Sequence, residues 1–301
     1  MEPFRHAFVA MASANEVQVC TPDPVVAHRA CMLAEREVAR IEAKFSRYRD
    51  DSIVTRINRS AGGPPVAVDE ETAALLAYAD ACWQQSDGLF DITSGILRRA
   101  WNFRGGALPG AEQVAQWLPH VGWQRVRRSP AAVALEAGME IDFGGIGKEY
   151  AADRAAAAAQ AAGAHSGLVN LGGDVRVIGP RPDGQPWRVG IAHPRRPGTM
   201  LAQIALQEGG LASSGDYERF IEIDGRRYCH ILDPRTGWPV ATAPQSVSVV
   251  APVCTAAGSC ATIAMLKAGD ASAFLRTTTL PYLLVDATGG VSGSLGAPAA
   301  A

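Results

Sequence analysis

The chain has 301 residues, of which 48% are hydrophobic and 19% charged, as in globular proteins with a sizeable core. Its formal net charge of -2 argues against binding to nucleic acid or to an anionic membrane, because such proteins usually carry a positively charged surface. Six scattered cysteines without a C-x-x-C pair or a His/Cys cluster argue against a zinc site and predict buried, reduced thiols.

The first predicted element is a strand over residues 8–19. Apolar side chains then recur at helical spacing over residues 25–45, which predicts an amphipathic helix. A turn rich in glycine and proline precedes a second helix that carries residues 73–82. Residues 99–140 have weak periodicity and predict a loop-rich connection that ends in a strand at 132–135.

The alanine-rich segment 150–163 is a strong helix former that ends at Gly163, and the apolar run 167–171 predicts a strand before a tight turn. From residue 187 onward, short apolar segments separated by Gly, Pro and Asp predict many strands around a helix at 255–269. Strands mixed with separate helices favour an α+β fold. We expect a single domain over residues 1–301, with its core at about 8–275 and a loose tail at 288–301.

The N-terminal region does not resemble an export signal or a membrane span. Its apolar stretch is too short and is interrupted by Arg5 and His6, and Glu2 is out of place in a basic leader. We therefore expect a cytoplasmic protein without a membrane span.

Three glycine-rich segments are candidates for binding a phosphate: DFGGIGKEY (142–150), NLGGDV (170–175) and SSGDYERF (213–220). Paired glycines allow backbone N–H groups to approach a phosphate closely. Lys148 stands where a helix should begin, so its amine and the free N–H groups could act on one anion. Each segment could also be an ordinary turn, Lys148 a solvated side chain, and Asp142 and Asp153 simple caps, a role that we favour for Asp153.

The segment CHILDPRTG (229–237) places His230 at the end of an apolar strand, before a turn formed by Asp233, Pro234 and Gly237. A histidine there could act as a base or position a ligand, since its ordinary pKa is near neutrality. A purely structural histidine is the alternative.

A family resemblance comes from the order and spacing of seven segments: FSRYRDDS, DGLFDITSG, DFGGIGKEYAAD, LVNLGGDV, PWRVGI, SSGDYERF and HILDPRTG. Together they resemble the ApbE-type FAD:protein FMN transferases, from about residue 8 to about residue 275. The resemblance implies a T-fold-like α+β architecture with mixed or antiparallel sheets and FAD in a central cleft. It also implies Mg²⁺-dependent transfer of FMN from FAD to a threonine or serine hydroxyl of a target flavoprotein, with release of AMP.

The same resemblance implies a set of site residues. A role at the nucleotide and catalytic centre falls to His230, and a metal-facing backbone carbonyl to Gly145. Ala261 and Thr262 match the metal-binding segment. The implied FAD contacts are Met11, Tyr48, Leu89, Phe90, Asp91, Asp142, Lys148 and Ile231. Without the family context, Tyr48 and Phe90 could equally be core aromatics.

Three features depart from the family pattern. The metal-binding segment D-A-x-A-T appears here as GSCAT, so Gly258 replaces an aspartate ligand of the kind Mg²⁺ prefers. Glu149 stands where the family usually has glycine; it could supply the missing carboxylate or cap a helix, and we favour the cap. Many relatives are lipoproteins with a cysteine near the N-terminus, whereas Cys20 lies in the first strand region.

Three functions are compatible with these features. We predict a transferase that acts on a protein carrying a D-S/T-G-A-T/S acceptor segment. A hydrolase that cleaves FAD to FMN and AMP would use the same geometry, with water as the acceptor. A flavin carrier or sensor would keep the pocket but would have lost catalysis with the aspartate.

Overall fold

The computed structural model of the chain describes residues 1–295. Within this range, eight strands form one antiparallel sheet in the order β1-β2-β6-β7-β10-β13-β14-β15. These strands are β1 (Phe4–Ala10), β2 (Ser13–Val19), β6 (Gly167–Leu171), β7 (Asp174–Gly179), β10 (Gly210–Gly215), β13 (Ser246–Ala251), β14 (Tyr282–Val285) and β15 (Val291–Gly293). The sheet with its helices confirms the expected α+β class.

The first predicted strand is in fact a hairpin. Residues 8–19 were expected to form one strand, but β1 and β2 pair across a two-residue turn at Met11 and Ala12. Both turn residues have positive φ, 52° and 58°, as a tight hairpin of this kind requires. The apolar pattern does not reveal the turn, because neither residue is the Gly or Asn that usually marks one.

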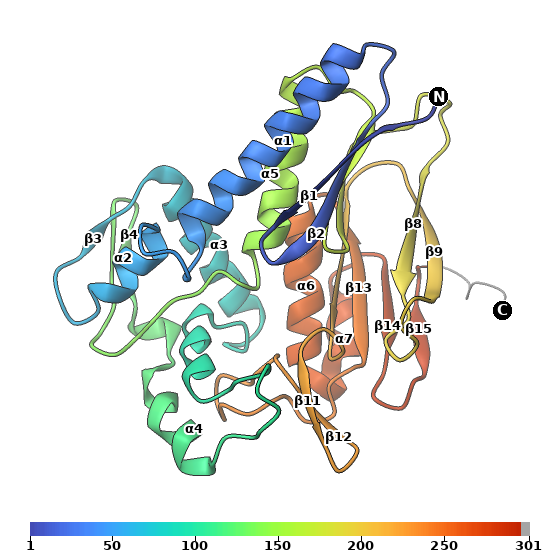
Figure 1. The fold of residues 1–301 in the computed structure, drawn as a ribbon. Helices are drawn as coiled ribbons and strands as arrows, with labels where there is room; N and C mark the ends of the chain where they lie inside the picture. The colour runs from blue at the N-terminus through green and yellow to red at the C-terminus, as the bar shows by residue number, and fades with distance from the viewer. Residues whose placement is uncertain (296–301) are drawn as a thin grey trace.

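Three helices cover one face of the sheet (Figure 1). They are α1 (Pro24–Phe45), α5 (Gly147–Ala161) and α6 (Cys254–Leu266). The predicted amphipathic helix is confirmed by α1, which begins at Pro24 after the capping side chain of Asp23. Ala151, Ala155 and Ala159 of α5 are fully buried, and these small side chains allow α5 to pack closely between α1 and α6.

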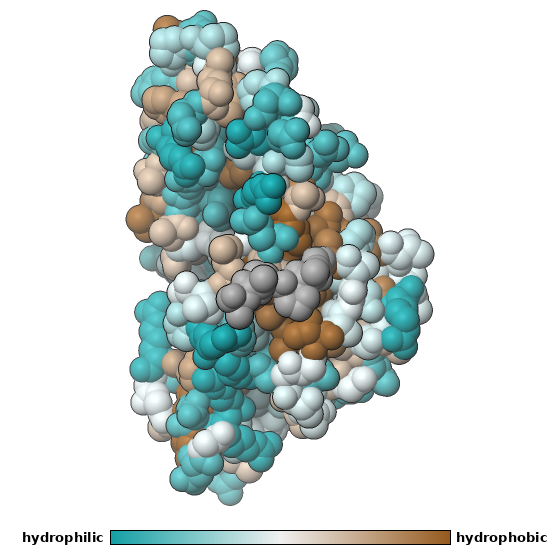
Figure 2. All heavy atoms as spheres, turned by 90° about the vertical axis from the view of Figure 1, so that its right-hand side faces the viewer, coloured by the Kyte–Doolittle hydropathy of each residue, from teal (hydrophilic) through white to brown (hydrophobic). Residues whose placement is uncertain are grey.

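A long hairpin covers the opposite face. It consists of β8 (Trp187–Ala192) and β9 (Met200–Leu206), which lie on the side of the sheet away from the helices (Figure 1). Consecutive side chains of β6 are buried on opposite faces of the sheet: Leu168 packs under the hairpin, and Val169 packs under the helices. Burial on both faces explains why this strand reads as a continuous apolar run. From the hairpin side the surface is mostly polar, with an apolar area at mid-height (Figure 2).

The segment between α1 and α5 forms a lobe at one end of these helices (Figure 1). It contains α2 (Ile53–Arg59), α3 (Glu70–Gln85), α4 (Ala111–Trp117), the 3₁₀ helices η1 (Ile92–Arg99), η2 (Leu118–His120) and η3 (Trp123–Arg125), and a small sheet of β3 (Val66–Ala67), β4 (Arg127–Ser129) and β5 (Ala132–Ala134). The predicted helix at 73–82 and the strand at 132–135 are thus confirmed. The hairpin of β11 (Phe220–Ile223) and β12 (Arg226–Cys229) packs against this lobe through Trp101 and Tyr228.

The chain ends differ partly from expectation. After α6 come the 3₁₀ helix η4 (Ala268–Asp270) and α7 (Ala271–Thr277). The tail 288–301 was expected to be loose, but Val291–Gly293 pairs with β14, which offers free backbone groups at the sheet edge; residues 296–301 lie outside the described range. None of the helices within residues 1–295 is long and apolar enough to cross a membrane. The single domain stays a prediction, supported by one core that includes both Val17 of the sheet and Leu76 of α3.

Candidate functional site

The three glycine-rich segments meet at the start of α5. Lys148, in the first turn of this helix, places its Nζ 2.6 Å from Oδ2 of Asp174, which belongs to the second segment. Ser213 of the third segment donates its backbone N–H to the other oxygen of Asp174, at 3.3 Å. The turn at Gly172 lies so close that a Cβ there would be 3.6 Å from Lys148 Nζ. These contacts bring the three candidate segments together at one place in the structure.

The ion pair between Lys148 and Asp174 is largely buried. The Asp174 side chain is 4% exposed and that of Lys148 is 32% exposed. Burial alone would lower the pKa of Lys148, but the adjacent Asp174 carboxylate outweighs it and the pKa is raised. Burial raises the pKa of Asp174 against the attraction of Lys148. The 2.6 Å contact between the two groups fixes the position of the lysine amine.

Glu149 is directed into the protein interior against α6. The residue is 8% exposed, and a Cβ built on Gly258 would lie 2.5 Å from both its Cγ and its Oε1. Its Oε2 is buried without a hydrogen-bond partner among residues 1–295. Burial and the nearby Asp174 raise the pKa of this carboxyl. Its place in the first turn of α5 suits a carboxylate, but a cap does not require contact with α6.

The helix α6 is capped by a side chain of its neighbour α5. The Asp153 carboxylate accepts hydrogen bonds from the backbone N–H groups of Cys254 and Thr255, both at 2.8 Å, and from the Thr255 hydroxyl at 2.6 Å. The predicted capping role of Asp153 is confirmed, although the helix it caps is not its own. This cap fixes the N-terminal end of α6, and Gly258 lies one turn further along the helix.

The two metal-segment residues lie on the same helix. Ala261 is fully buried, and the Thr262 hydroxyl lies 3.5 Å from that of Ser214 on β10. Because Thr262 follows Gly258 by four residues, both lie on one face of α6. Gly145 precedes α5, and no backbone N–H within residues 1–295 donates to its carbonyl oxygen.

Arg47 links two residues that the sequence singled out. Its guanidinium lies 2.7 Å from Asp142 Oδ2 and 2.9 Å from the Tyr48 hydroxyl. Tyr48 is 78% exposed, so it is not a core aromatic. Arg47 stands in the segment FSRYRDDS but was not identified as a site residue from the sequence. No sequence signal distinguishes it from the other arginines, and only the structure shows its contact with Asp142.

The segment from Leu89 to Asp91 is buried beside the site. A Cβ at Gly145 would lie 3.2 Å from the Phe90 ring, so Phe90 packs directly under this glycine. The Asp91 carboxylate accepts hydrogen bonds from the N–H groups of Thr93 and Trp123, at 2.7 and 2.9 Å. Asp91 therefore fixes the backbone of its own loop. Met11 lies beside the first residue of α5, where a Cβ on Gly147 would be 3.9 Å from its methyl group.

His230 follows β12, one residue beyond the end of the strand. Its Nδ1 lies 3.2 Å from the carbonyl oxygen of Arg219, in the third glycine-rich segment. Burial and the charge of Arg219 lower the pKa of His230 to about 4, so the ring is neutral at neutral pH. Because Nδ1 faces an acceptor, it carries the proton and Nε2 remains an acceptor. The adjoining Ile231 is buried.

The turn after His230 has the predicted form. Gly237 donates its N–H to the Asp233 carbonyl at 2.8 Å and has a φ of 73°, which favours glycine. Its own carbonyl accepts a hydrogen bond from the Trp101 indole at 2.8 Å. The turn is thereby held against the lobe.

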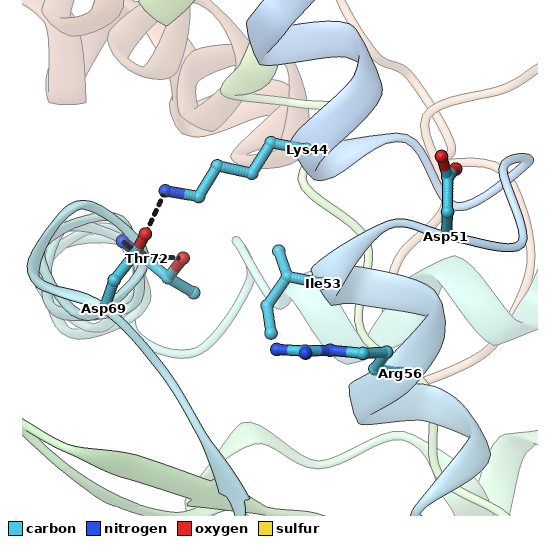
Figure 3. Close-up of a pocket in the computed structure, with 6 residues that line it drawn as sticks. All are labelled: Lys44, Asp51, Ile53, Arg56, Asp69 and Thr72. Atoms are coloured by element: carbon cyan, nitrogen blue, oxygen red, sulfur yellow. Dashed lines mark hydrogen bonds and ion pairs between the residues drawn. The ribbon is translucent and has the colours of Figure 1, made fainter.

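A surface pocket of about 300 Å³ lies away from these residues. Figure 3 shows it between the end of α1, α2 and α3. Its Lys44 pairs with Asp69 at 2.5 Å, and Asp69 also caps α3 through the N–H of Thr72 at 3.0 Å. Its lining residues are Lys44, Asp51, Ile53, Arg56, Asp69 and Thr72. Since its chemistry serves helix capping, we assign it no ligand.

In the part of the chain that the structure describes, histidine, cysteine and carboxylate side chains do not form a metal cluster by themselves. Within residues 1–295, no group of three or more of them is arranged to hold an ion. A metal at the Glu149–Gly258 contact would therefore need backbone and hydroxyl oxygens as well.

The fold and the site define the class of this protein: an α+β protein in which three glycine-rich segments and a half-buried lysine form a candidate anion-binding centre. Comparison with known proteins is more specific. Residues 11–284 match the ApbE family. The chain therefore belongs to the ApbE family.

Several curated relatives and solved structures are similar to the chain. It is 35% identical over 240 residues to the FAD:protein FMN transferase of Treponema pallidum, which covers 73% of this chain and 66% of that protein. The FAD:protein FMN transferase of Klebsiella pneumoniae is 30% identical over 82% of this chain and 77% of its own length. The crystal structure of the ApbE protein of Thermotoga maritima is 33% identical, with a TM-score of 0.89 over 97% of each chain. These matches confirm the predicted family and fold.

Proposed function

We propose that this chain is an FAD:protein FMN transferase, which attaches the FMN half of FAD to a threonine or serine hydroxyl of a partner protein. The observation that carries this proposal is the convergence of three glycine-rich segments on Lys148 and Asp174. Membership of the ApbE family supports it, as do the names of the relatives in Treponema pallidum and Klebsiella pneumoniae.

The reaction exchanges one phosphorus–oxygen bond for another. The acceptor hydroxyl attacks the FMN phosphorus, the bond to the AMP phosphate breaks, and AMP leaves. Lys148 and the N–H groups at the start of α5 would bind the negatively charged diphosphate. His230 would take the hydroxyl proton, because its ring is neutral and its Nε2 is free to accept.

The flavin would lie along the residues that the family resemblance indicates. Tyr48 is exposed and is held by Arg47 against Asp142, so these side chains offer an ordered polar edge. The proposed FAD contacts are Met11, Tyr48, Leu89, Phe90, Asp91, Asp142, Lys148 and Ile231. Asp91 would act through its loop, since its carboxylate is already occupied.

The residues present fit a divalent cation. Among residues 1–295, Gly145 offers a carbonyl without a backbone N–H partner, Thr262 a hydroxyl, and Glu149 a buried oxygen without a hydrogen-bond partner. Hard cations such as Mg²⁺ prefer oxygen ligands of these kinds. When bound, Mg²⁺ would neutralise charge on the diphosphate and so assist the transfer. Ala261, fully buried beside Thr262, would keep this part of α6 closely packed.

The test is to incubate the protein with FAD, Mg²⁺ and an acceptor domain that carries a D-S/T-G-A-T/S segment. We expect the mass of the acceptor to increase by one FMN, with equimolar AMP. An acceptor with valine in place of the target threonine is the matched control and should gain no mass. Absence of an adduct under all metal conditions would refute the proposal.

The same assay separates the two alternatives. AMP released without an acceptor would indicate a hydrolase, and FAD binding without AMP would indicate a carrier or sensor. The cytoplasmic location expected from the sequence stays a prediction, which fractionation of cells would test.

A further inference from the structure

Two unusual residues of this chain lie in contact. Glu149 on α5 and Gly258 on α6 are more than one hundred positions apart, yet a Cβ on Gly258 would lie 2.5 Å from Glu149 Cγ and Oε1. Real Cβ atoms do not approach other atoms this closely. With Glu149 in this position, no side chain larger than hydrogen fits at 258.

We propose that Glu149 provides the carboxylate ligand of the divalent cation, in exchange for the aspartate that the family pattern has at position 258. The inference rests on the proposed function for the presence of a cation in this region. In this arrangement the carboxylate reaches the site from α5 and fills the space that a side chain on α6 would occupy. Glu149 and Gly258, which both depart from the family pattern, would then result from one exchange of the carboxylate between α6 and α5.

The partners of the neighbouring carboxylates support this assignment. Asp174 is paired with Lys148 at 2.6 Å, and Asp153 accepts hydrogen bonds from the first turn of α6 and pairs with Arg176 at 3.2 Å. Glu149 is 8% exposed, and its Oε2 has no partner within residues 1–295. An unpaired buried carboxylate oxygen is costly, and a bound cation would remove that cost.

Two other oxygen donors lie within one helical turn of the contact. Gly145 precedes Glu149 by four residues at the start of α5, and its carbonyl accepts no backbone N–H within residues 1–295. Thr262 follows Gly258 by four residues on the same face of α6. A carboxylate, a carbonyl and a hydroxyl form an oxygen set of the kind that Mg²⁺ and Mn²⁺ accept.

The first experiment measures metal binding without FAD or acceptor. Mn²⁺ is titrated into the protein and followed by electron paramagnetic resonance, and melting temperatures are measured with EDTA and with Mg²⁺. We expect Glu149→Gln to weaken Mn²⁺ binding at least ~10-fold and to abolish the rise in melting temperature caused by Mg²⁺. In EDTA the variant should melt no lower than the wild type, because a neutral amide is less costly to bury unpaired.

A matched control is Glu140→Gln. Glu140 is also buried, but its carboxylate is held by Arg98 and Arg99. This variant should keep the wild-type Mn²⁺ affinity even if it loses stability. Unchanged Mn²⁺ affinity in Glu149→Gln, or equal weakening in both variants, would overturn the inference.

The second experiment moves the carboxylate back to α6. Glu149→Gly should bind Mn²⁺ weakly, and the double variant Glu149→Gly with Gly258→Asp should recover binding to within about tenfold of the wild type. Gly258→Asp alone should lower the melting temperature because the new side chain meets Glu149. A folded double variant that does not bind Mn²⁺ better than Glu149→Gly would contradict the exchange.

These experiments distinguish a failure of the inference from a failure of the proposed function. Mn²⁺ binding that depends on Glu149 without any FMN transfer would refute the function and leave the inference standing. FMN transfer together with a Mn²⁺ affinity that Glu149→Gln does not change would refute the inference and leave the proposed function standing.

Discussion

Breaking the ion pair between Lys148 and Asp174 should cost different amounts according to which partner is removed. Asp174 is 4% exposed, whereas the Lys148 side chain is 32% exposed. Without Lys148 the carboxylate stays buried and keeps a long hydrogen bond from the Ser213 N–H, at 3.3 Å. Without the Asp174 charge, the lysine amine can still reach water. We therefore expect Lys148→Met to destabilise the protein more than Asp174→Asn.

The magnitudes follow from this difference in burial. Removing one partner of a buried pair costs about 3–5 kcal/mol, and we expect Lys148→Met to fall in this range. Asp174→Asn keeps a hydrogen-bonding side chain and leaves a partly solvated ammonium, so about 1–2 kcal/mol is expected. The double variant should be more stable than Lys148→Met alone, because it leaves no unpaired buried charge.

The pH dependence gives a second, independent signature. Burial already raises the pKa of Asp174, and loss of Lys148 removes the attraction that opposes this rise. A carboxyl whose pKa is higher in the folded than in the unfolded state stabilises the fold below the unfolded value and loses this contribution as pH rises through the folded value. The deficit of Lys148→Met should therefore be smaller at pH 5 than at pH 8.

Urea unfolding followed by tryptophan fluorescence, at both pH values, measures these differences. Asp174→Asn serves as the control that removes the titrating group. The reasoning is refuted if Lys148→Met costs no more than Asp174→Asn, or if its deficit is the same at pH 5 and pH 8.

Three further predictions concern other parts of the structure. Asp153→Ala should lower the free energy of unfolding by about 1–2 kcal/mol in urea titrations, because α6 loses its cap. Asp153→Asn should lower this free energy by less. Equal losses in the two variants would contradict a capping role. The imidazole of His230 should titrate near pH 4 when followed by nuclear magnetic resonance. Because its pKa is about 4 in the folded state and 6.5 in the unfolded state, its contribution to stability should be lost as pH falls from 6.5 towards 4. Titration near 6.5 would disprove the burial argument. The six cysteines are all free and buried, so a thiol reagent should modify them only on unfolding, and rapid labelling of the native protein would contradict this.

Much of the fold follows from local patterns that the sequence displays. Helical spacing in residues 25–45 predicted α1 to within one residue, and the alanine-rich segment before Gly163 predicted α5. The hairpin turn at Met11 and Ala12 was missed because the apolar run of residues 7–12 continues through it and neither turn residue is a Gly or Asn. A pattern of hydrophobicity predicts an element, but where the chain reverses depends on φ angles that these residue types do not reveal.

The sequence by itself determined the family, the glycine-rich segments and the candidate residues within them, because their order and spacing are written along the chain. Only the tertiary structure decided what these residues contact: Lys148 meets Asp174, Arg47 meets Asp142, and Glu149 fills the space over Gly258. Sequence reasoning favoured a helix cap for Glu149, since its position at the start of α5 suits one. Its side-chain direction depends on how α5 packs against α6, and such packing joins positions that no local pattern connects.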